Sequence, residues 1–228
     1  MADPRGLTAA STIARRTLLG LAGIGALAAV PGCSAGRGAD GRAARQTTAT
    51  AEESGGAALV APAVRAVPLA VEGTRVVPVT GLAIALMAGA RALAPESLGP
   101  GRAEVTYAWS QDPSWGYLVI EGPAAFDAAV DDAAQAAAHT AGQALVADRV
   151  AASEAAKGDW KGFETCCQIA WNQFAAPPGW EDETSVDALE LFLVDGQSRS
   201  YTLTAYVPHG DLAKANPAFT SLCSAVPA

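Results

Sequence analysis

The clearest structural signal in this chain is the stretch "VDALELFLVDGQSRSYTLTAYVP" (Val186–Pro208). Its two halves, 186–196 and 198–208, are rich in aliphatic, β-branched and aromatic residues, which favour β-strands. Asp195-Gly196 stands between the two apolar runs, and this dipeptide is typical of the turn in a β-hairpin. The stretch therefore predicts two antiparallel strands.

A third strand is predicted just before this hairpin. The segment "FETCCQIAWNQF" (Phe163–Phe174) places Phe163, Cys167, Ile169 and Trp171 on one face, by the period of two that strands have. The three strands together would form a meander.

Another hairpin is predicted earlier in the chain. "AEVTYAWSQ" (Ala103–Gln111) alternates in polarity and "WGYLVIEG" (Trp115–Gly122) is β-branched and aromatic, with Asp112-Pro113-Ser114 between them as turn residues. Farther upstream, "RVVPVTGLAIALMAGARAL" (Arg75–Leu93) contains two apolar runs broken by Thr-Gly and Gly-Ala. This pattern indicates a strand pair, or a strand and a turn.

Two helices are expected beside these strands. "PAAFDAAVDDAAQAAAHTAG" (Pro123–Gly142) repeats apolar or small residues at helical spacing, with acidic residues near the positive N-terminal end of the predicted helix. "LAKANPAFTSLCSAV" (Leu212–Val226) predicts a short helix that turns Phe219, Leu222 and Cys223 inward. Residues 143–160 are compatible with either helix or strand.

This order of elements predicts an α+β fold, with a single antiparallel β-sheet packed with helices. About 170 residues, 59–228, are enough for one domain with one core. The patterns "GLAIALMAGARAL", "YLVIEGPAAFDAAV" and "LFLVDGQSRSYTLTAYVPHGDLAKANPAFTSLCSAV" also resemble PsbP/Mog-type domains. Some members of that family are bacterial lipoproteins, so the resemblance implies an accessory role in the cell envelope.

The N-terminal segment "TIARRTLLGLAGIGALAAVPGCSAG" (Thr12–Gly36) predicts an export signal. Arg15 and Arg16 precede an uncharged apolar run that is too short and too rich in Gly and Ala for a permanent membrane span. "ARRTLL" resembles the twin-arginine (Tat) signal, and "AVPGC" resembles the lipobox of bacterial lipoproteins. That resemblance implies cleavage before Cys33 and acylation of Cys33, for example with palmitate.

The segment that follows Cys33 contains almost no large apolar side chain, so it cannot form a packed core. We therefore expect three parts: residues 1–32 as a removed export signal, 33–58 as a lipid-anchored disordered tether, and 59–228 as the folded PsbP/Mog-like domain. Two or three acyl chains on Cys33 would hold the protein firmly on the extracytoplasmic face of the cell membrane.

The charge of the chain narrows the classes of partner. The full chain has 15 basic and 23 acidic residues, and removal of residues 1–32 leaves a net charge of about −10. Nucleic acids and anionic lipid headgroups both require a basic surface, so neither is an expected partner. The membrane would be reached through the lipid alone.

Three cysteines remain beyond Cys33, which outside the cytoplasm predicts one disulfide and one free thiol. A bond between the adjacent Cys166 and Cys167 would be strained. Because Cys167 shares its predicted strand face with apolar residues and Cys223 faces inward from its helix, a Cys167–Cys223 disulfide is the pair we expect. A register shift of one residue would exchange Cys166 for Cys167.

No catalytic or metal site is predicted. The chain has no Gly-x-Ser-x-Gly motif and only two histidines, His139 near a helix end and His209 in a turn. The acidic segment "GWEDET" (Gly179–Thr184) lacks the ligand spacing of a calcium loop and reads as a solvated loop. No cofactor is expected, and the protein is not expected to be an enzyme.

Tryptophan is the residue type that points to binding. Trp115, Trp160 and Trp180 each stand beside Gly, Pro, Ser or acidic residues, where amphipathic rings often serve contact surfaces. They are the candidate binding residues. The sequence thus predicts a cell-envelope lipoprotein whose non-catalytic domain binds a protein or cell-wall partner. The alternative is a carrier of an apolar ligand such as a lipid or glycolipid, which would need a cavity between sheet and helix.

Overall fold

The computed structural model describes residues 59–73, 75–77, 80–110, 115–144 and 151–228. The chain divides into two units, Met1–Gly56 and Ala57–Ala228, and the described residues all belong to the second. The predicted export signal with Arg15 and Arg16, the predicted lipidation site Cys33 and the predicted tether lie outside the described residues.

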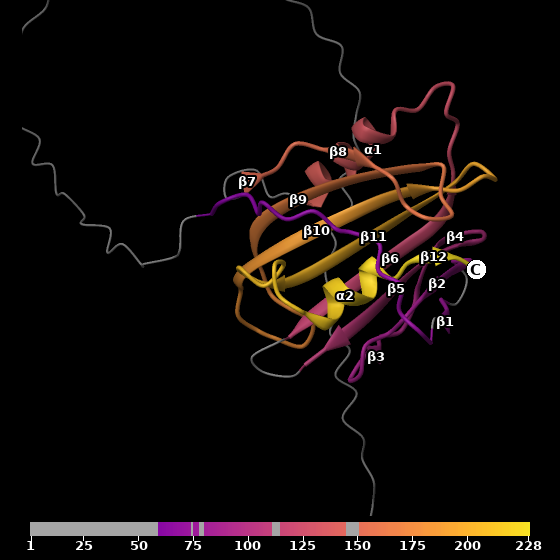
Figure 1. The fold of residues 1–228 in the computed structure, drawn as a ribbon. Coiled ribbons are helices and arrows are strands. Elements are labelled where there is room, and N and C mark those ends of the chain that lie inside the picture. Colours follow the sequence, from indigo (N-terminus) through magenta and orange to yellow (C-terminus); the bar gives the residue numbers. More distant parts are fainter. Residues whose placement is uncertain (1–58, 74, 78–79, 111–114, 145–150) are drawn as a thin grey trace, which may run out of the picture. The chain divides into compact units, whose positions relative to one another are not determined.

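A large antiparallel sheet forms the body of the second unit. Its strands are β3 (Arg91–Ala92), β4 (Glu96–Gly99), β5 (Arg102–Trp109), β6 (Gly116–Ala125), β7 (Ala151–Ala152), β8 (Ala156–Gly158), β9 (Thr165–Ala175), β10 (Thr184–Val194) and β11 (Arg199–Pro208). Within the described residues this sheet has nine strands, in the order β3-β5-β6-β11-β10-β9-β7, with β4 paired to β5 and β8 paired to β9 (Figure 1).

The two predicted hairpins and the meander are confirmed. β10 pairs with β11 from Val186↔Pro208 to Val194↔Ser200, and β9 pairs along the other edge of β10. β5 pairs with β6 in the same antiparallel sense. The turn between β10 and β11 is fixed by Asp195, whose buried carboxylate accepts the backbone N–H groups of Gln197 and Arg199.

A smaller sheet is formed by β1 (Arg75–Val76), β2 (Leu82–Ile84) and β12 (Val226–Pro227), in the order β1-β2-β12. It confirms the strand pair expected near residue 80, and it also recruits the C-terminal end of the chain, which was not expected.

Two helices are present in the described part of the chain, α1 (Ala133–Ala144) and α2 (Pro217–Cys223). Each begins at a side chain that caps its free N–H groups: Asp132 accepts from the backbone N of Ala134, and Asn216 accepts from the backbone N of Ala218, both at 2.9 Å. Neither of these two helices is long and apolar enough to cross a membrane.

The predicted start of the first helix at Pro123 is wrong. β6 continues through Pro123 to Ala125, because this end of the strand still pairs with β11 at Arg199. Val130, an apolar residue of that predicted helix, is 79% exposed in the turn before α1. Sheet pairing over long sequence distance has overridden the local helical spacing.

The large sheet presents two different faces, because alternate residues of a strand point to opposite sides. On β10, the odd-numbered Leu189, Leu191 and Leu193 pack with Ala218, Leu222 and Cys223 of α2. The even-numbered Phe192 and Val194 pack with Ala133 and Ala137 of α1. We call these the α2 face and the α1 face of the large sheet, and Figure 1 shows the two helices on opposite sides of it.

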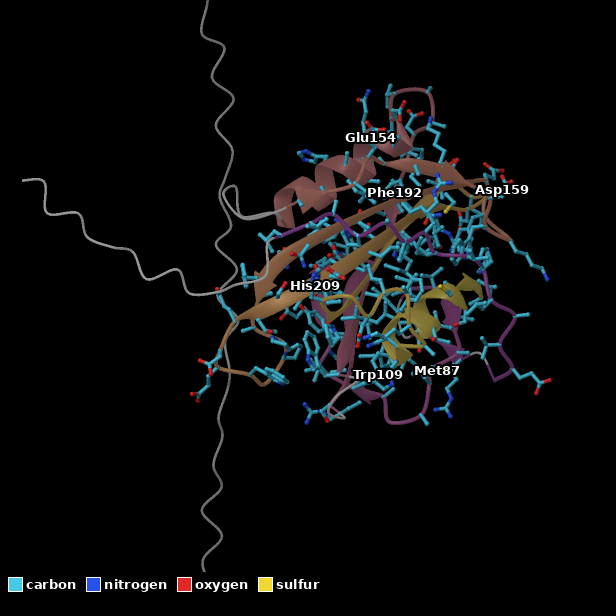
Figure 2. All side chains as sticks on the ribbon, turned by 60° about the vertical axis from the view of Figure 1, so that its left-hand side comes forward. Met87, Trp109, Glu154, Asp159, Phe192 and His209 are labelled. Carbon is cyan, nitrogen blue, oxygen red and sulfur yellow. The ribbon has the colours of Figure 1, made fainter. Side chains whose placement is uncertain are left out.

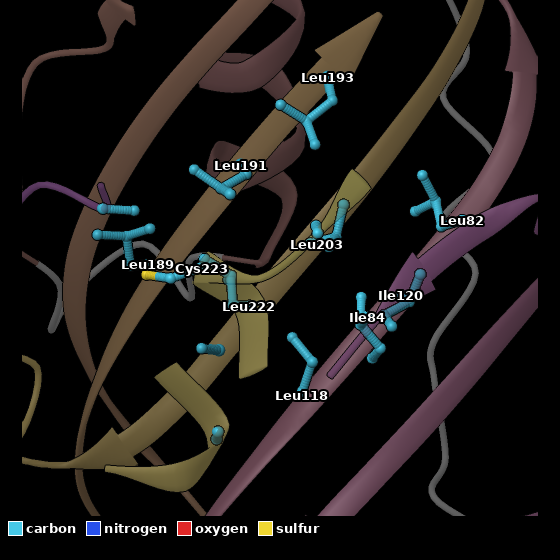
Figure 3. Close-up of a cluster of buried hydrophobic side chains, with 14 of the residues drawn as sticks. Leu82, Ile84, Leu118, Ile120, Leu189, Leu191, Leu193, Leu203, Leu222 and Cys223 are labelled. Atoms are coloured by element: carbon cyan, nitrogen blue, oxygen red, sulfur yellow. The ribbon is translucent and has the colours of Figure 1, made fainter. Parts of the chain in front are cut away.

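The main core lies on the α2 face, between the large sheet, α2 and the small sheet. It is built largely from buried leucines and isoleucines, which Figure 3 draws as sticks: Leu82, Ile84, Leu118, Ile120, Leu189, Leu191, Leu193, Leu203 and Leu222. Trp109 closes one end, where its indole N–H donates to the carbonyl of Met87 at 3.1 Å (Figure 2).

The N-terminal segment before β1 is fastened to this core by a side chain. Gln168 of β9 accepts the backbone N–H of Ala66 at 2.8 Å and donates to the carbonyl of Ala66 at 3.4 Å. Three residues later, the backbone N of Leu69 donates to the carbonyl of Cys223. We refer to the Gln168–Ala66 pair as the Gln168 clamp.

The predicted fold class, an α+β fold with a single antiparallel sheet packed with helices, is wrong. Twelve strands and two short helices make up the regular structure of the described residues, and three of those strands form a second sheet. The segment 151–158, which the sequence left open between helix and strand, forms the edge strands β7 and β8. The protein is a mostly β structure with a large nine-stranded antiparallel sheet within these described residues.

Candidate binding face

Two of the three candidate tryptophans meet at one end of the α1 face. The rings of Trp115 and Trp180 lie 5.5 Å apart, and Trp180 is 48% exposed while Trp115 is buried beneath it. Trp160 does not belong to this group. It is 3% exposed in the main core and donates its indole N–H to the carbonyl of Ala225 at 2.8 Å, so it is a structural residue that holds the C-terminal segment.

The tryptophan pair continues into a row of aromatic rings that the sequence did not single out. Tyr117 stacks near Trp115 with ring centroids 6.5 Å apart, and Tyr206 stacks on Tyr117 at 4.5 Å. Trp171 meets Tyr206 edge-on at 6.1 Å. We call Trp115, Tyr117, Trp171, Trp180 and Tyr206 the aromatic cluster.

Strand register brings this cluster together. Tyr117 of β6 is the direct partner of Tyr206 on β11, which is paired with Ala188 of β10, and Ala188 is paired with Trp171 of β9. The small side chain of Ala188 lets the rings of Tyr206 and Trp171 meet across it. A row of four strands therefore presents three rings on one face of the sheet.

α2 supports the cluster from the other side of the sheet. The side-chain N–H₂ of Asn216 donates to the carbonyl of Trp115 at 3.1 Å, while its oxygen caps α2. Gly116 allows this close approach, because a Cβ at that position would lie 2.8 Å from the Asn216 oxygen and 3.0 Å from the Cβ of Ala218. The same Asn216 side chain thus caps α2 and holds the backbone of Trp115, the first ring of the aromatic cluster.

Beside the aromatic cluster, the α1 face carries three carboxylates. Glu104 and Glu121 are direct partners on β5 and β6, and Glu190 lies on β10 between Ala188 and Phe192. Glu190 is 2% exposed and its Oε1 atom has no hydrogen-bond partner. Burial, and secondly the charge of Glu121, raises the pKa of Glu190 to about 8.

Between α1 and the aromatic cluster the α1 face is partly accessible to solvent, although Glu190, Thr204 and Ile169 are buried there. Five of its side chains are only half-buried: Thr106, Val119, Glu121, Thr202 and Tyr206. They lie on β5, β6 and β11, to one side of Glu190, whose direct partners Thr204 and Ile169 are both buried. This part of the sheet combines an exposed rim, a buried acid and adjacent aromatic rings.

A second polar cluster lies at the same end of the sheet on the α2 face. Asp187, buried on β10, accepts hydrogen bonds from Asn172 at 2.8 Å and from the backbone N of Gly210 at 2.7 Å, and it contacts Nδ1 of His209 at 2.9 Å. The His209 side chain is 39% exposed, and Figure 2 shows it far along the sheet from Phe192. This cluster fixes the turn after β11, as the turn position of His209 in the sequence implies.

The structure corrects the expected cysteine geometry. All three described cysteines are buried free thiols. Cys166 belongs to the main core with Cys223, whereas Cys167 points to the α1 face and packs with Phe126 and Phe192. The expected Cys167–Cys223 disulfide would have to pass through the sheet. The predicted strand face holds for Cys167, Ile169 and Trp171 but not for Phe163, which precedes β9 and packs against the main core. α2 covers the face opposite to Cys167.

Other predicted features lie apart from the binding face. His139 is exposed on α1, and Glu181, Asp182 and Glu183 are exposed in the loop before β10. Among the described residues, no three His, Cys, Asp or Glu side chains are grouped so that they could hold a metal ion. The absence of a metal, a cofactor and a catalytic activity stays a prediction.

Sequence reasoning missed Tyr117, Tyr206 and Glu190. The signal that could have found Glu190 was its place in "ALELFLV", where an acid interrupts a strand that is apolar on both faces. No protein-family model matches this chain, and a search of curated proteins finds no match. The site therefore has to be interpreted from its own chemistry.

Proposed function

We propose that this protein is a bacterial cell-envelope lipoprotein whose folded domain is a non-catalytic binding module. The observation that carries the proposal is the aromatic cluster, with exposed Trp180 and half-buried Tyr206, on a solvent-exposed part of the α1 face. Aromatic rings beside polar groups are the residues that dominate protein recognition surfaces. The partner in this proposal is a protein or the cell wall.

Presentation of this domain at the membrane is the second part of the proposal. The twin-arginine pair Arg15 and Arg16 directs export, and acylated Cys33 anchors the chain on the extracytoplasmic face of the cell membrane. Residues 34–58 then act as a tether between the lipid and the domain. The composition of that segment supports this role, because it offers few apolar side chains that could pack.

A binding assay with isolated cell envelopes tests the proposed module. Full-length protein, solubilised in mild detergent, is sedimented with envelope fragments of the source bacterium, and we expect Trp180→Ala and Tyr206→Ala each to lower the apparent affinity about tenfold, as hot-spot rings do. Leu69→Ala is the matched control, because Leu69 is an exposed apolar residue outside the aromatic cluster. Equal binding by all three variants and the unchanged protein would contradict the proposal.

The alternative, a carrier of an apolar ligand, is less well supported. The described pocket at the edge of β9 has a volume of about 210 Å³ and is lined in part by Arg65, Glu154 and Gln168. Such a small pocket with a mixed polar and apolar lining does not favour a lipid chain, because ligand cavities are mostly larger and more apolar. Native mass spectrometry of the protein from its source distinguishes the two functions, since a co-purified lipid would favour the carrier.

A further inference from the structure

The pocket at the edge of β9 brings three parts of the chain together. It has a volume of about 210 Å³ and is lined by residues 62–65 before β1, by Ser153, Glu154 and Ala156 at the edge strands, and by residues 168–170 of β9 with Leu189 of β10. None of these residues belongs to the aromatic cluster. We call this site the edge pocket.

Two opposite charges line the edge pocket. Arg65 contributes a guanidinium and Glu154 a carboxylate, and the other lining residues carry no charge. Both side chains are exposed, so a ligand can reach them from solvent. Among the described residues, no ion pair includes Arg65 or Glu154. Their charges are therefore available to a ligand that carries both signs.

Hydrogen bonds to β9 fix the backbone next to each of these charges. The Gln168 clamp holds the residue directly after Arg65. Ser153, directly before Glu154, donates its backbone N–H to the carbonyl of Ala170 at 2.7 Å, and its hydroxyl accepts the backbone N–H of Ala170 at 3.0 Å. Gln168 and Ala170 are two residues apart on one strand, so they share a face of the sheet. The two charges thus start from fixed points at neighbouring positions along β9.

The deeper part of the edge pocket is apolar. Ala170 and Leu189 are direct strand partners, 2% and 1% exposed, and Val64 packs against the same core. A cavity of about 150 Å³ is enough to hold benzene, so a volume of about 210 Å³ holds roughly eight or nine non-hydrogen atoms. That is the size of an amino acid such as leucine.

We propose that the edge pocket binds a free α-amino acid with an apolar side chain. Its carboxylate pairs with Arg65, its ammonium group pairs with Glu154, and its side chain packs against Ala170 and Leu189. The Ser153 hydroxyl can donate a hydrogen bond to the same carboxylate, because it acts as the acceptor in its bond to Ala170. The edge pocket is separate from the aromatic cluster, so its ligand goes beyond the proposed envelope-binding function and does not depend on it.

Charge complementarity selects a zwitterion over other small molecules. Glu154 would repel an anion and Arg65 would repel a cation, whereas an amino acid offers each of them an opposite charge. A neutral apolar molecule would take water from both charged groups without replacing its hydrogen bonds, which is unfavourable. Hydrogen bonds between a guanidinium and a carboxylate are also among the stronger ones in proteins.

Titration calorimetry of the full-length protein in mild detergent tests the ligand class. L-leucine is compared with leucinamide, which lacks the carboxylate, and with N-acetylleucine, which lacks the ammonium group. We expect each analogue to bind about tenfold more weakly than leucine. Equal affinities of the three ligands, or no binding of leucine, would overturn the proposal. Tighter binding of the dipeptide alanyl-leucine than of leucine would contradict the assignment to a free amino acid.

Two variants assign each charge of the ligand to its partner. Arg65→Gln should lower the affinity for leucine about tenfold without lowering that for leucinamide, and Glu154→Gln should do the same with N-acetylleucine as the insensitive ligand. Both residues are exposed, so the variants should fold. Arg75→Gln and Glu72→Gln are matched controls, since they change exposed side chains of the same types outside the pocket. Unaltered leucine affinity in either pocket variant would show that the proposal is wrong.

Hydrogen exchange locates the bound ligand. A ligand that joins Arg65 to Glu154 ties the segment before β1 to the edge of the large sheet, so leucine should slow exchange of the Ala66 amide. Unchanged exchange at saturating leucine would place the ligand elsewhere and overturn the proposal. Trp180→Ala should bind leucine with unchanged affinity, so the result for the edge pocket and the result of the envelope assay are independent.

Discussion

Two buried carboxylates in this protein, Glu190 and Asp195, differ in their hydrogen-bond partners, and these partners decide how costly it is to bury the charged form. Glu190 has an unpartnered oxygen, whereas Asp195 is surrounded by donors: two backbone N–H groups, the Arg199 guanidinium and the Tyr201 hydroxyl at 2.9 Å. Burial alone would raise the pKa of Asp195, but the hydrogen bonds from Arg199, Gln197 and Tyr201 outweigh it and lower that pKa. The pKa values of Glu190 and Asp195 are therefore shifted in opposite directions.

Replacement of Asp195 by Asn should lower the free energy of unfolding by about 2 kcal/mol at pH 7, because charge-assisted hydrogen bonds to Arg199 and Tyr201 are lost. Since the pKa of Asp195 is lowered on folding, its contribution is present above its ordinary value of 3.8 and is lost as the pH falls below it. Urea unfolding at pH 7 and pH 3 measures both effects. A gap between variant and unchanged protein that stays constant over this range would contradict the prediction.

At the scale of elements, Asn216 connects α2 to Trp115, directly before the start of β6, and we call this connection the Asn216 joint. Its side chain caps the helix and holds the carbonyl of Trp115, the first ring of the aromatic cluster. A disturbance of this seven-residue helix on the α2 face is therefore transmitted to the α1 face.

Asn216→Ala should destabilise the domain by about 1–2 kcal/mol, through loss of the cap and of the bond to Trp115. It should also shift the tryptophan fluorescence, because Trp115 contacts Trp180. Asn216→Asp is the matched control: it keeps the capping oxygen and loses the donor, so it should retain most of the stability and still alter the fluorescence. Identical spectra for both variants and the unchanged protein would show that the joint does not exist.

The sequence was most informative where pairing is local. Both hairpins, the meander and the terminal helix follow from alternation and from turn residues such as Asp195-Gly196, which act within a few residues. It was misleading or undecided where partners are distant in the chain. The extension of β6 to Ala125, where a helix was predicted, depends on β11. The edge strands β7 and β8, which the sequence left open between helix and strand, depend on β9. The side of the sheet that α2 covers also depends on packing, which explains the error in the cysteine pair.

For the candidate site too, the sequence revealed what depends on local context and missed what depends on distant segments. Trp115 and Trp180 could be selected from their residue type and loop context, but Tyr117, Tyr206 and Glu190 acquire their positions from the register of four strands. Trp160 has a similar sequence context to the other two and is nevertheless buried, because the C-terminal segment returns to cover it. Residue type identified candidates, and register decided among them.

For the whole molecule, the proposed anchor makes a direct prediction. Cys33→Ala should move the protein from the membrane fraction to the soluble fraction, because no helix of the described residues could span a membrane and acylation would be lost. Fractionation followed by immunoblotting measures this. Replacement of Arg15 and Arg16 by Lys is the companion variant, and it should reduce export without releasing the exported protein. A Cys33→Ala protein that stays fully in the membrane fraction would contradict the proposed anchor.

The Gln168 clamp gives the domain a defined mechanical weak point. We expect a pull on the chain from the N-terminal side to meet the Gln168 clamp and the packing of Val64 and Ala66 in the main core before it reaches Leu69 and the strands. We expect these few contacts to yield at a lower force than the long ladders that join β9, β10 and β11. Under tension, the N-terminal segment held by the Gln168 clamp would therefore detach first, and the large sheet with its binding face would stay folded.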